Sequence, residues 1–296
     1  MKRTMTFWID TRIARRHGVR AAAVAGYLFA HVRRAALEVG ARDGEGRGWV
    51  RVSQEQIAQQ LHLCRQTVAK ILRTLTDAGI LVAANFYTDA EGSEHIIEAS
   101  SALKGKARAA CHLAKANRGY TMGDAGFRMM GLKPRQWHVW HEEALMCSAI
   151  NTGVCAKVGI NAAIVFQYLW HWSRAWRWSS RYIKGDRVWQ PYTAAVLSRW
   201  LPFLSDDVIG DALHVLEREG LLLKLREGCL TKWAIGDGGF RAMGEMPPLQ
   251  VIPAHQCEEE RNRYLKSVFF PYPTPPLLFP HTSLRANEPH SKDECL

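Results

Sequence analysis

The chain has 296 residues, 47% hydrophobic and 23% charged, with a formal net charge of +11, and this composition predicts a globular protein with material for two domain cores. No apolar run reaches the roughly 18 residues of a membrane span, the first residues lack the apolar centre of a signal peptide, and the seven cysteines form no C-x-x-C pair. We therefore expect a cytoplasmic protein with reduced thiols, no cofactor and no membrane partner.

The first predicted elements are a long helix, a strand and a second helix. Apolar side chains recur every four residues over 18–37, a spacing typical of a helix with one buried face. A charged, glycine-rich loop follows, and the run 49–52 is too short for a helix and predicts a strand. Ser53 is a typical N-cap for the second helix, whose apolar positions are Ile57 and Leu61.

A tight turn separates the second helix from a third. In the third helix Val68, Leu72 and Leu75 form the apolar stripe, and Gly79 is a typical C-terminal stop. The following apolar run predicts the first strand of a hairpin, and we interpret residues 82–121 as an extended wing between its strands. The order helix, strand, helix, turn, helix, hairpin is that of a winged helix-turn-helix.

This module is suited to bind DNA. Its third helix presents side chains to base edges in the major groove, and its wing reaches the DNA backbone. Arginine and lysine suit guanine, glutamine suits adenine, and threonine suits phosphate. The predicted wing is basic, which favours contact with phosphates. The alternative is that residues 82–121 are a solvated insertion. Cys64, at the N-cap of the third helix, predicts a poor cap or a buried thiol, with a redox switch as the alternative. The predicted DNA-binding residues are Arg51, Ser53, Gln54, Arg65, Gln66, Thr67, Lys70, Arg73, Lys104, Lys106, Arg108, Lys115 and Arg118.

The second half of the chain repeats the first at a nearly constant offset in residue number, and the block 123–131 returns as 236–244. Such a repeat indicates a duplicated domain. The predicted fold is therefore mainly α with small β wings, an α+β class built from tandem winged helix-turn-helix domains. We name residues 1–135 unit one and residues 136–245 unit two; a proline-rich tail covers 246–296. Matched positions include Gly18/Gly159, Ala22/Ala163, Tyr27/Tyr168, Leu28/Leu169, Trp49/Trp189, Leu61/Leu201, Leu72/Leu213, Leu75/Leu216 and Gly79/Gly220.

The third helix of unit two has the opposite charge. Ser205 precedes Asp206 and Asp207, and Asp211 follows one turn later. Carboxylates stabilise a helix N-terminus, but they repel phosphate. We therefore expect Asp206, Asp207 and Asp211 to contact a partner protein, or unit one of another copy, rather than DNA.

The positive charge of the chain lies in unit one. Residues 1–135 hold 22 Lys and Arg against 11 Asp and Glu, whereas residues 136–296 hold 17 of each. A basic excess confined to one domain is typical of a protein that binds nucleic acid. A solvated basic surface is the alternative.

Four segments of unit two carry a family resemblance. Together they resemble the winged-helix domain of phage and mobile-element replication proteins, the replisome organisers and initiators, over about residues 137–235. Through the repeat the similarity extends weakly to 7–82, and the tandem plan also resembles plasmid replication initiators. The resemblance implies binding to origin DNA and recruitment of replication machinery. The segments are GINAAIVFQYLWHW at 159–172, VWQPY at 188–192, LPFLS at 201–205 and LEREGLL at 216–222.

Signals for enzyme or metal chemistry are weak. No G-x-x-x-x-G-K-[ST] loop is present, so we expect no ATP hydrolysis and no other enzyme activity. His138, His141 and Glu142 lie close in sequence, but Trp137 and Trp140 alternate with them and the H-E-x-x-H order is missing. We therefore expect an aromatic cluster there and no metal site.

Two functions remain open. The first is a replication initiator or organiser that reads double-stranded DNA mainly with unit one and recruits a replication or other host protein, or another copy of itself, through unit two and the tail. The second is a transcriptional repressor, or a mobile-element protein that acts on a host complex.

Overall fold

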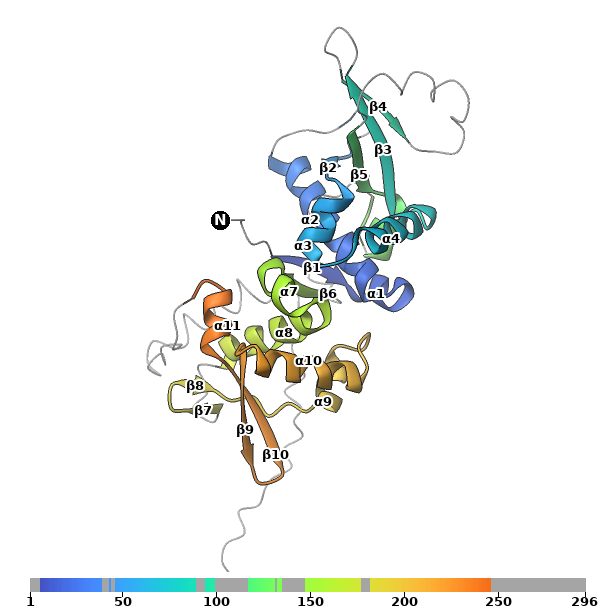
Figure 1. Ribbon diagram of the computed structural model, residues 1–296. Coiled ribbons are helices and arrows are strands. Elements are labelled where there is room, and N and C mark those ends of the chain that lie inside the picture. Colours follow the sequence, from blue (N-terminus) through green and yellow to red (C-terminus); the bar gives the residue numbers. More distant parts are fainter. Residues whose placement is uncertain are drawn as a thin grey trace, which may run out of the picture.

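Helices and short antiparallel sheets alternate along the computed structural model, a mixed α+β architecture (Figure 1). Among the described residues, no helix is long and apolar enough to cross a membrane. Four predicted wing residues, Lys104, Lys106, Arg108 and Lys115, and the tail lie outside the described part of the chain. The structure describes residues 6–38, 43, 46–88, 94–98, 117–130, 132–134, 147–176 and 182–245.

Unit one begins with a strand and a short helix that the apolar pattern did not predict, and then follows the predicted order. Its described elements are β1 (Thr6–Asp10), α1 (Thr11–His17), α2 (Val19–Glu38), β2 (Val50–Arg51), α3 (Gln54–Leu61), α4 (Arg65–Asp77), β3 (Leu81–Thr88), β4 (Glu94–Glu98), β5 (Asn117–Met122) and α6 (Asp124–Met129).

The predicted helices of unit one are confirmed, and local hydrogen bonds explain their ends. The hydroxyl of Ser53 accepts from the Gln56 amide, and the Gln56 side chain accepts from the Ser53 amide, which is a capping box at the start of α3. His62, with a φ of 54°, ends α3 in the left-handed region. Gly79, with a φ of 67°, follows α4, as expected of a helix stop.

The strands of unit one form a four-stranded sheet in the order β2-β5-β3-β4. All pairs are antiparallel, and the predicted strand at 49–52 is β2, which pairs with β5. β3 pairs with β5 over Leu81–Phe86 and with β4 over Ala84–Thr88. The predicted hairpin is therefore part of a larger sheet that extends away from the helices (Figure 1).

Unit two repeats this order with shorter strands. An isolated bridge between Gln190 and Trp233 joins the segment before α9 to β10, which pairs in turn with β9. This succession matches that of β2, β5 and β3. The described elements of unit two are β6 (Cys147–Asn151), α7 (Thr152–Val158), α8 (Ile160–Trp176), β7 (Ile183–Lys184), β8 (Arg187–Val188), α9 (Ala194–Trp200), α10 (Asp206–Arg218), β9 (Leu222–Glu227), β10 (Leu230–Ile235) and α11 (Asp237–Ala242).

An antiparallel pair of strands, β1 and β6, joins the two units (Figure 1). The register places Trp8 opposite Ala149, its own counterpart in the repeat, so the pairing is the same when seen from either unit. Asp10 and Asn151, which are likewise counterparts, each accept two backbone amides and cap α1 and α7. The repeat therefore extends back to the strand and short helix that begin each unit.

The hydrophobic core is continuous from one unit into the other and includes buried residues of β1 and β6. α2 lies directly on β1, and Gly26 permits this approach, because a Cβ there would lie 2.1 Å from the carbonyl oxygen of Trp8. α3 packs against α7, where the Cys155 thiol lies 3.6 Å from the Leu61 carbonyl oxygen. The contact between the units is thus part of the core.

The repeated block that ends each unit packs against the glycine after the third helix. A Cβ on Gly123 would lie 2.2 Å from the carbonyl oxygen of Gly79, and one on Gly236 would lie 2.6 Å from that of Gly220. Because backbone meets backbone at these points, neither contact has room for a side chain. This close approach explains why the glycines recur in both copies of the block.

Candidate nucleic-acid interface

α4 has one buried side and one exposed side. Val68, Leu72 and Leu75 are buried, as predicted. Residues spaced three or four apart fall on one face of a helix, and such a row is exposed on the opposite side. Within the described part of the chain, neither Lys70 nor Arg73 forms an ion pair, so both charges are available to a phosphate or base. The α4 row consists of Gln66, Lys70, Arg73 and Asp77.

Arg65, in the first turn of α4, is paired with Glu55 at the start of α3. The Nε of Arg65 lies 2.6 Å from the Oε1 of Glu55. A hydrogen bond at its own backbone amide lowers the pKa of Glu55, and the charge of Arg65 contributes. The side chains of Arg65 and Glu55 are 68% and 51% exposed, so solvent weakens the pair. Glu55, which the sequence did not single out, thus competes with phosphate for Arg65.

Cys64 occupies the N-cap of α4, but its side chain makes no capping hydrogen bond, which confirms the expected poor cap. The alternative of a buried thiol is wrong, because Cys64 is exposed. Its Sγ lies 2.9 Å from the hydroxyl of Thr67, and this side-chain hydrogen bond lowers the pKa of the thiol. The half-buried Thr67 hydroxyl is therefore already in contact with Cys64. The cations of the α4 row, in contrast, form no ion pair with another described residue. In unit two, Ser205 accepts from the Val208 amide at the equivalent cap.

The predicted residues at the start of α3 lie beside the sheet. Gln54 lies near the side chain of Tyr120, and the guanidinium of Arg118 lies over the Tyr120 ring, 5.9 Å from its centroid. Ser53 is exposed, although its hydroxyl is used in the capping box. Glu55, the next residue after Gln54, reaches Arg65 in the first turn of α4.

Arg51 lies on the other face of the sheet. It pairs with Gly119, and side chains alternate between faces along a strand, so Arg51 and Arg118 point to opposite faces. The guanidinium of Arg51 lies over the ring of Phe86, 4.6 Å from its centroid. The structure therefore does not bring Arg51 together with α4.

α10 presents carboxylates where α4 presents cations. Asp206, Asp207 and Asp211 are exposed, and none of them forms an ion pair with another described residue. Acidic residues in the first turn stabilise a helix, which accounts for Asp206 and Asp207 but not for Asp211. The α10 row, the counterpart of the α4 row in the repeat and likewise exposed, consists of Asp207, Asp211, His214 and Arg218.

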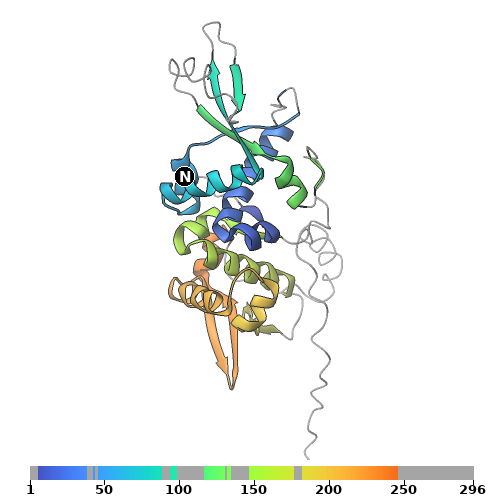
Figure 2. The same ribbon diagram turned by 90° about the vertical axis from the view of Figure 1, so that its right-hand side faces the viewer.

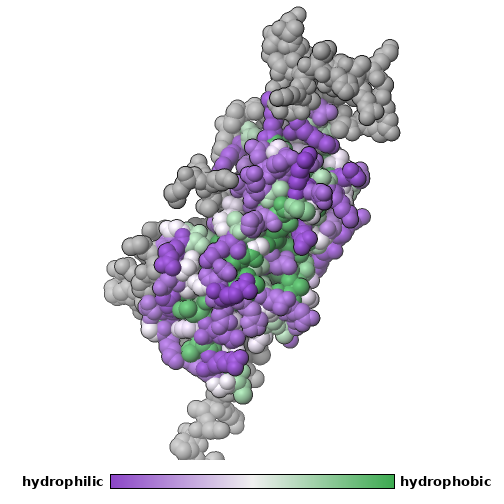
Figure 3. All heavy atoms as spheres, in the orientation of Figure 1, coloured by the Kyte–Doolittle hydropathy of each residue, from purple (hydrophilic) through white to green (hydrophobic). Residues whose placement is uncertain are grey.

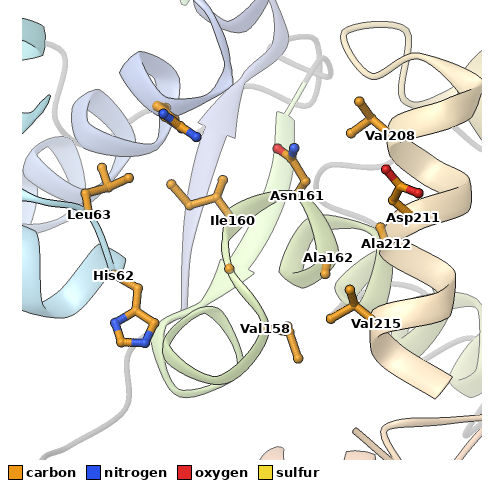
Figure 4. A pocket seen from close by; sticks show the side chains of 12 residues that line it. His62, Leu63, Val158, Ile160, Asn161, Ala162, Val208, Asp211, Ala212 and Val215 are labelled. Carbon is orange, nitrogen blue, oxygen red and sulfur yellow. The ribbon is translucent and has the colours of Figure 1, made fainter. Parts of the chain in front are cut away.

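A hollow of about 330 Å³ lies between the units, beside α10 (Figure 4). Unit one lines it with His62 and Leu63 of the turn between α3 and α4, and with Arg20. Unit two lines it with residues from the start of α8 and from α10, including Val208 and Asp211, and Asp211 is directed toward the hollow. Hydrophobic residues reach the surface where the two units meet (Figure 3). Asp211 thus stands at the wall of a hollow that both polar and apolar residues line.

Among the described residues, no group of three His, Cys, Asp or Glu side chains could hold a metal ion. His138, His141 and Glu142 lie outside those residues. No protein-family model matches the chain, and no curated protein or solved structure was found to be similar to it. The function of the candidate interface must therefore be inferred from its own geometry and charge.

Proposed function

We propose that this chain is a sequence-specific double-stranded DNA-binding protein built from two winged helix-turn-helix units, and that unit one reads the DNA. The order of elements from α2 to β5 supports the fold, since α3 braces α4 and β2 completes a sheet with the following strands. In helix-turn-helix modules, the second helix of the motif enters the major groove. That helix is α4 in unit one.

The observation that carries the proposal is the exposed α4 row on the basic unit, whose cations form no ion pair with any other described residue. Lys70 and Arg73 offer charged donors that suit guanine or phosphate, and Gln66 offers an amide that suits adenine. Arg65, in the first turn of α4, and Arg118, on β5, are exposed and offer further cations that would contact the DNA backbone. The acidic α10 has no comparable surface for phosphate.

The resemblance of unit two to phage and mobile-element replication proteins supports a role at a replication origin, with unit two and the tail recruiting a replication protein. A transcriptional repressor, or a protein that acts on a host complex, is the second candidate, because the same DNA-reading surface serves either role. Footprinting on the DNA around the coding sequence separates them. An initiator protects repeated sites and distorts the DNA, whereas a repressor covers one promoter.

Fluorescence anisotropy with a labelled duplex tests DNA binding directly. The logarithm of affinity should fall by about 0.9 per log unit of salt for each phosphate neutralised. On a duplex selected for tight binding, Lys70→Ala should cost about 1–3 kcal/mol if Lys70 contacts a base. Lys133→Ala is the matched control, since Lys133 is exposed elsewhere in unit one. Affinity that stays flat between low and physiological salt would refute the proposal.

A further inference from the structure

The α4 row and the α10 row have opposite charge at two of their four equivalent positions. Lys70 corresponds to Asp211, and Asp77 corresponds to Arg218; at the remaining two positions glutamine becomes aspartate and arginine becomes histidine. All eight side chains are exposed. A duplicated domain does not require such a reversal, because the buried stripes of both helices stay apolar. The reversal makes each row a complementary surface for the other.

We propose that two copies of this chain form a twofold dimer in which α4 of each copy lies on α10 of the other. Lys70 and Arg73 are one helical turn apart, and so are Asp207 and Asp211, so both cations can meet both carboxylates at once. This complementarity identifies the occupant of α10 as a second copy of the chain.

The arrangement of the helices allows the dimer to close. α4 and α10 lie on the same side of the molecule (Figure 1 and Figure 2). A twofold axis across this side brings α4 of one copy to α10 of the other and, by symmetry, α10 of the first copy to α4 of the second. With this axis, the basic unit one of each copy faces unit two of the other copy. The two basic units therefore do not face each other.

The hollow beside α10 supplies apolar contact for this dimer. Val208 and Val215 of α10 and Leu63 of unit one line it, and Asp211 stands at its wall. A long basic side chain can lay its methylene stem on such apolar residues while its charged head reaches a carboxylate. His62 lies across the hollow from Asp211 (Figure 4), and Asp211 is the acidic residue of the lining that would attract an incoming cation from α4.

The dimer would regulate DNA binding, a consequence that rests on the proposed function although the dimer itself does not. With α4 covered by α10 of the other copy, the α4 row cannot enter a groove. DNA and the second copy therefore compete for the same cations. Exposed ion pairs contribute little individually and are screened by salt, so we expect a weak, salt-sensitive dimer.

Sedimentation velocity of the full chain without DNA tests the dimer. The wild type should form dimers at low salt and monomers at high salt. An acidic variant, Lys70→Asp with Arg73→Asp, and a basic variant, Asp207→Lys with Asp211→Lys, should each be monomeric alone. Mixed in equal amounts they should form a heterodimer, because the acidic α4 then meets the basic α10 and the unchanged α10 meets the unchanged α4.

Two controls keep this experiment decisive. Arg128→Asp and Asp124→Lys reverse exposed charges on α6 and should leave the wild-type dimer intact. Circular dichroism checks that every variant is folded. A wild type that is monomeric at low salt, variants that still dimerise alone, or a mixture that stays monomeric would each overturn the dimer. None of these outcomes bears on whether the monomer binds DNA, which anisotropy measures separately.

Discussion

The Arg65–Glu55 ion pair sets how much free positive charge the first turn of α4 offers. Glu55→Gln removes the carboxylate 2.6 Å from the guanidinium and leaves Arg65 for the DNA. We expect DNA affinity to rise about two- to fivefold, the range of a weak exposed ion pair. Anisotropy at fixed salt measures the change, with Asp124→Asn on α6 as the control. A loss of affinity would mean that Glu55 holds Arg65 in its reading position.

His171 in α8 is a buried group whose charge state links stability to pH. Burial, with a contribution from Arg174, lowers the pKa of His171 to about 4. Between pH 6.5, its unfolded pKa, and pH 4, the unfolded chain binds more protons than the folded chain. Stability should therefore fall as the pH drops through this range, by about 3 kcal/mol at most. Urea unfolding at pH 7 and pH 4.5 measures the loss. His171→Phe should flatten it, and an unchanged pH dependence in that variant would assign it to other groups.

At the scale of elements, the start of α6 lies so close to the end of α4 that even the methyl group of alanine should not fit at Gly123. A Cβ on Gly123 would lie 2.2 Å from the Gly79 carbonyl oxygen, so Gly123→Ala should destabilise the fold by about 1–3 kcal/mol through overpacking. Gly210→Ala in α10 is the control. Its Cβ meets nothing within 4 Å, and replacing a helical glycine should stabilise by about 0.4–1 kcal/mol. Urea unfolding compares them; equal stability of both variants would contradict the contact.

Elements with local signals could be predicted from the sequence. The four-residue apolar spacing predicted α2, Ser53 predicted the start of α3, and Gly79 predicted the end of α4, because caps and periodicity act within a few residues. The Arg65–Glu55 pair could not be predicted. It depends on how α3 and α4 pack, and nothing in the spacing of the two residues indicates that they meet.

At the scale of the whole molecule, the pairing of β1 with β6 was beyond prediction from local pattern. Each strand is short and its partner lies in the other unit, so the residues of one strand do not indicate what it pairs with. A signal was nevertheless present. Asp10-Thr11 and Asn151-Thr152 continue the repeat and cap equivalent helices. Reading the repeat outward from its apolar core would have shown that the two segments are equivalent, although not that they pair.

The proposed division of labour between the units also belongs to this scale. Unit one carries the basic excess and the α4 row, and unit two carries the acidic α10 within the same architecture. If α10 entered a groove, Asp206 and Asp207 would face phosphates, and like charges at that distance are costly. Reversing charge on one helix at a time should therefore affect DNA binding very differently.

The most direct test compares two variants on one duplex selected from a random library by the wild-type protein. Lys70→Ala with Arg73→Ala should lose most of the sequence-specific affinity, whereas Asp206→Lys with Asp207→Lys should bind equally well or more tightly, while its self-association weakens. Anisotropy measures both affinities, and thermal unfolding confirms that both variants are folded. If the Asp206/Asp207 variant lost specific binding while the Lys70/Arg73 variant retained it, α10 and not α4 would be the helix that reads DNA.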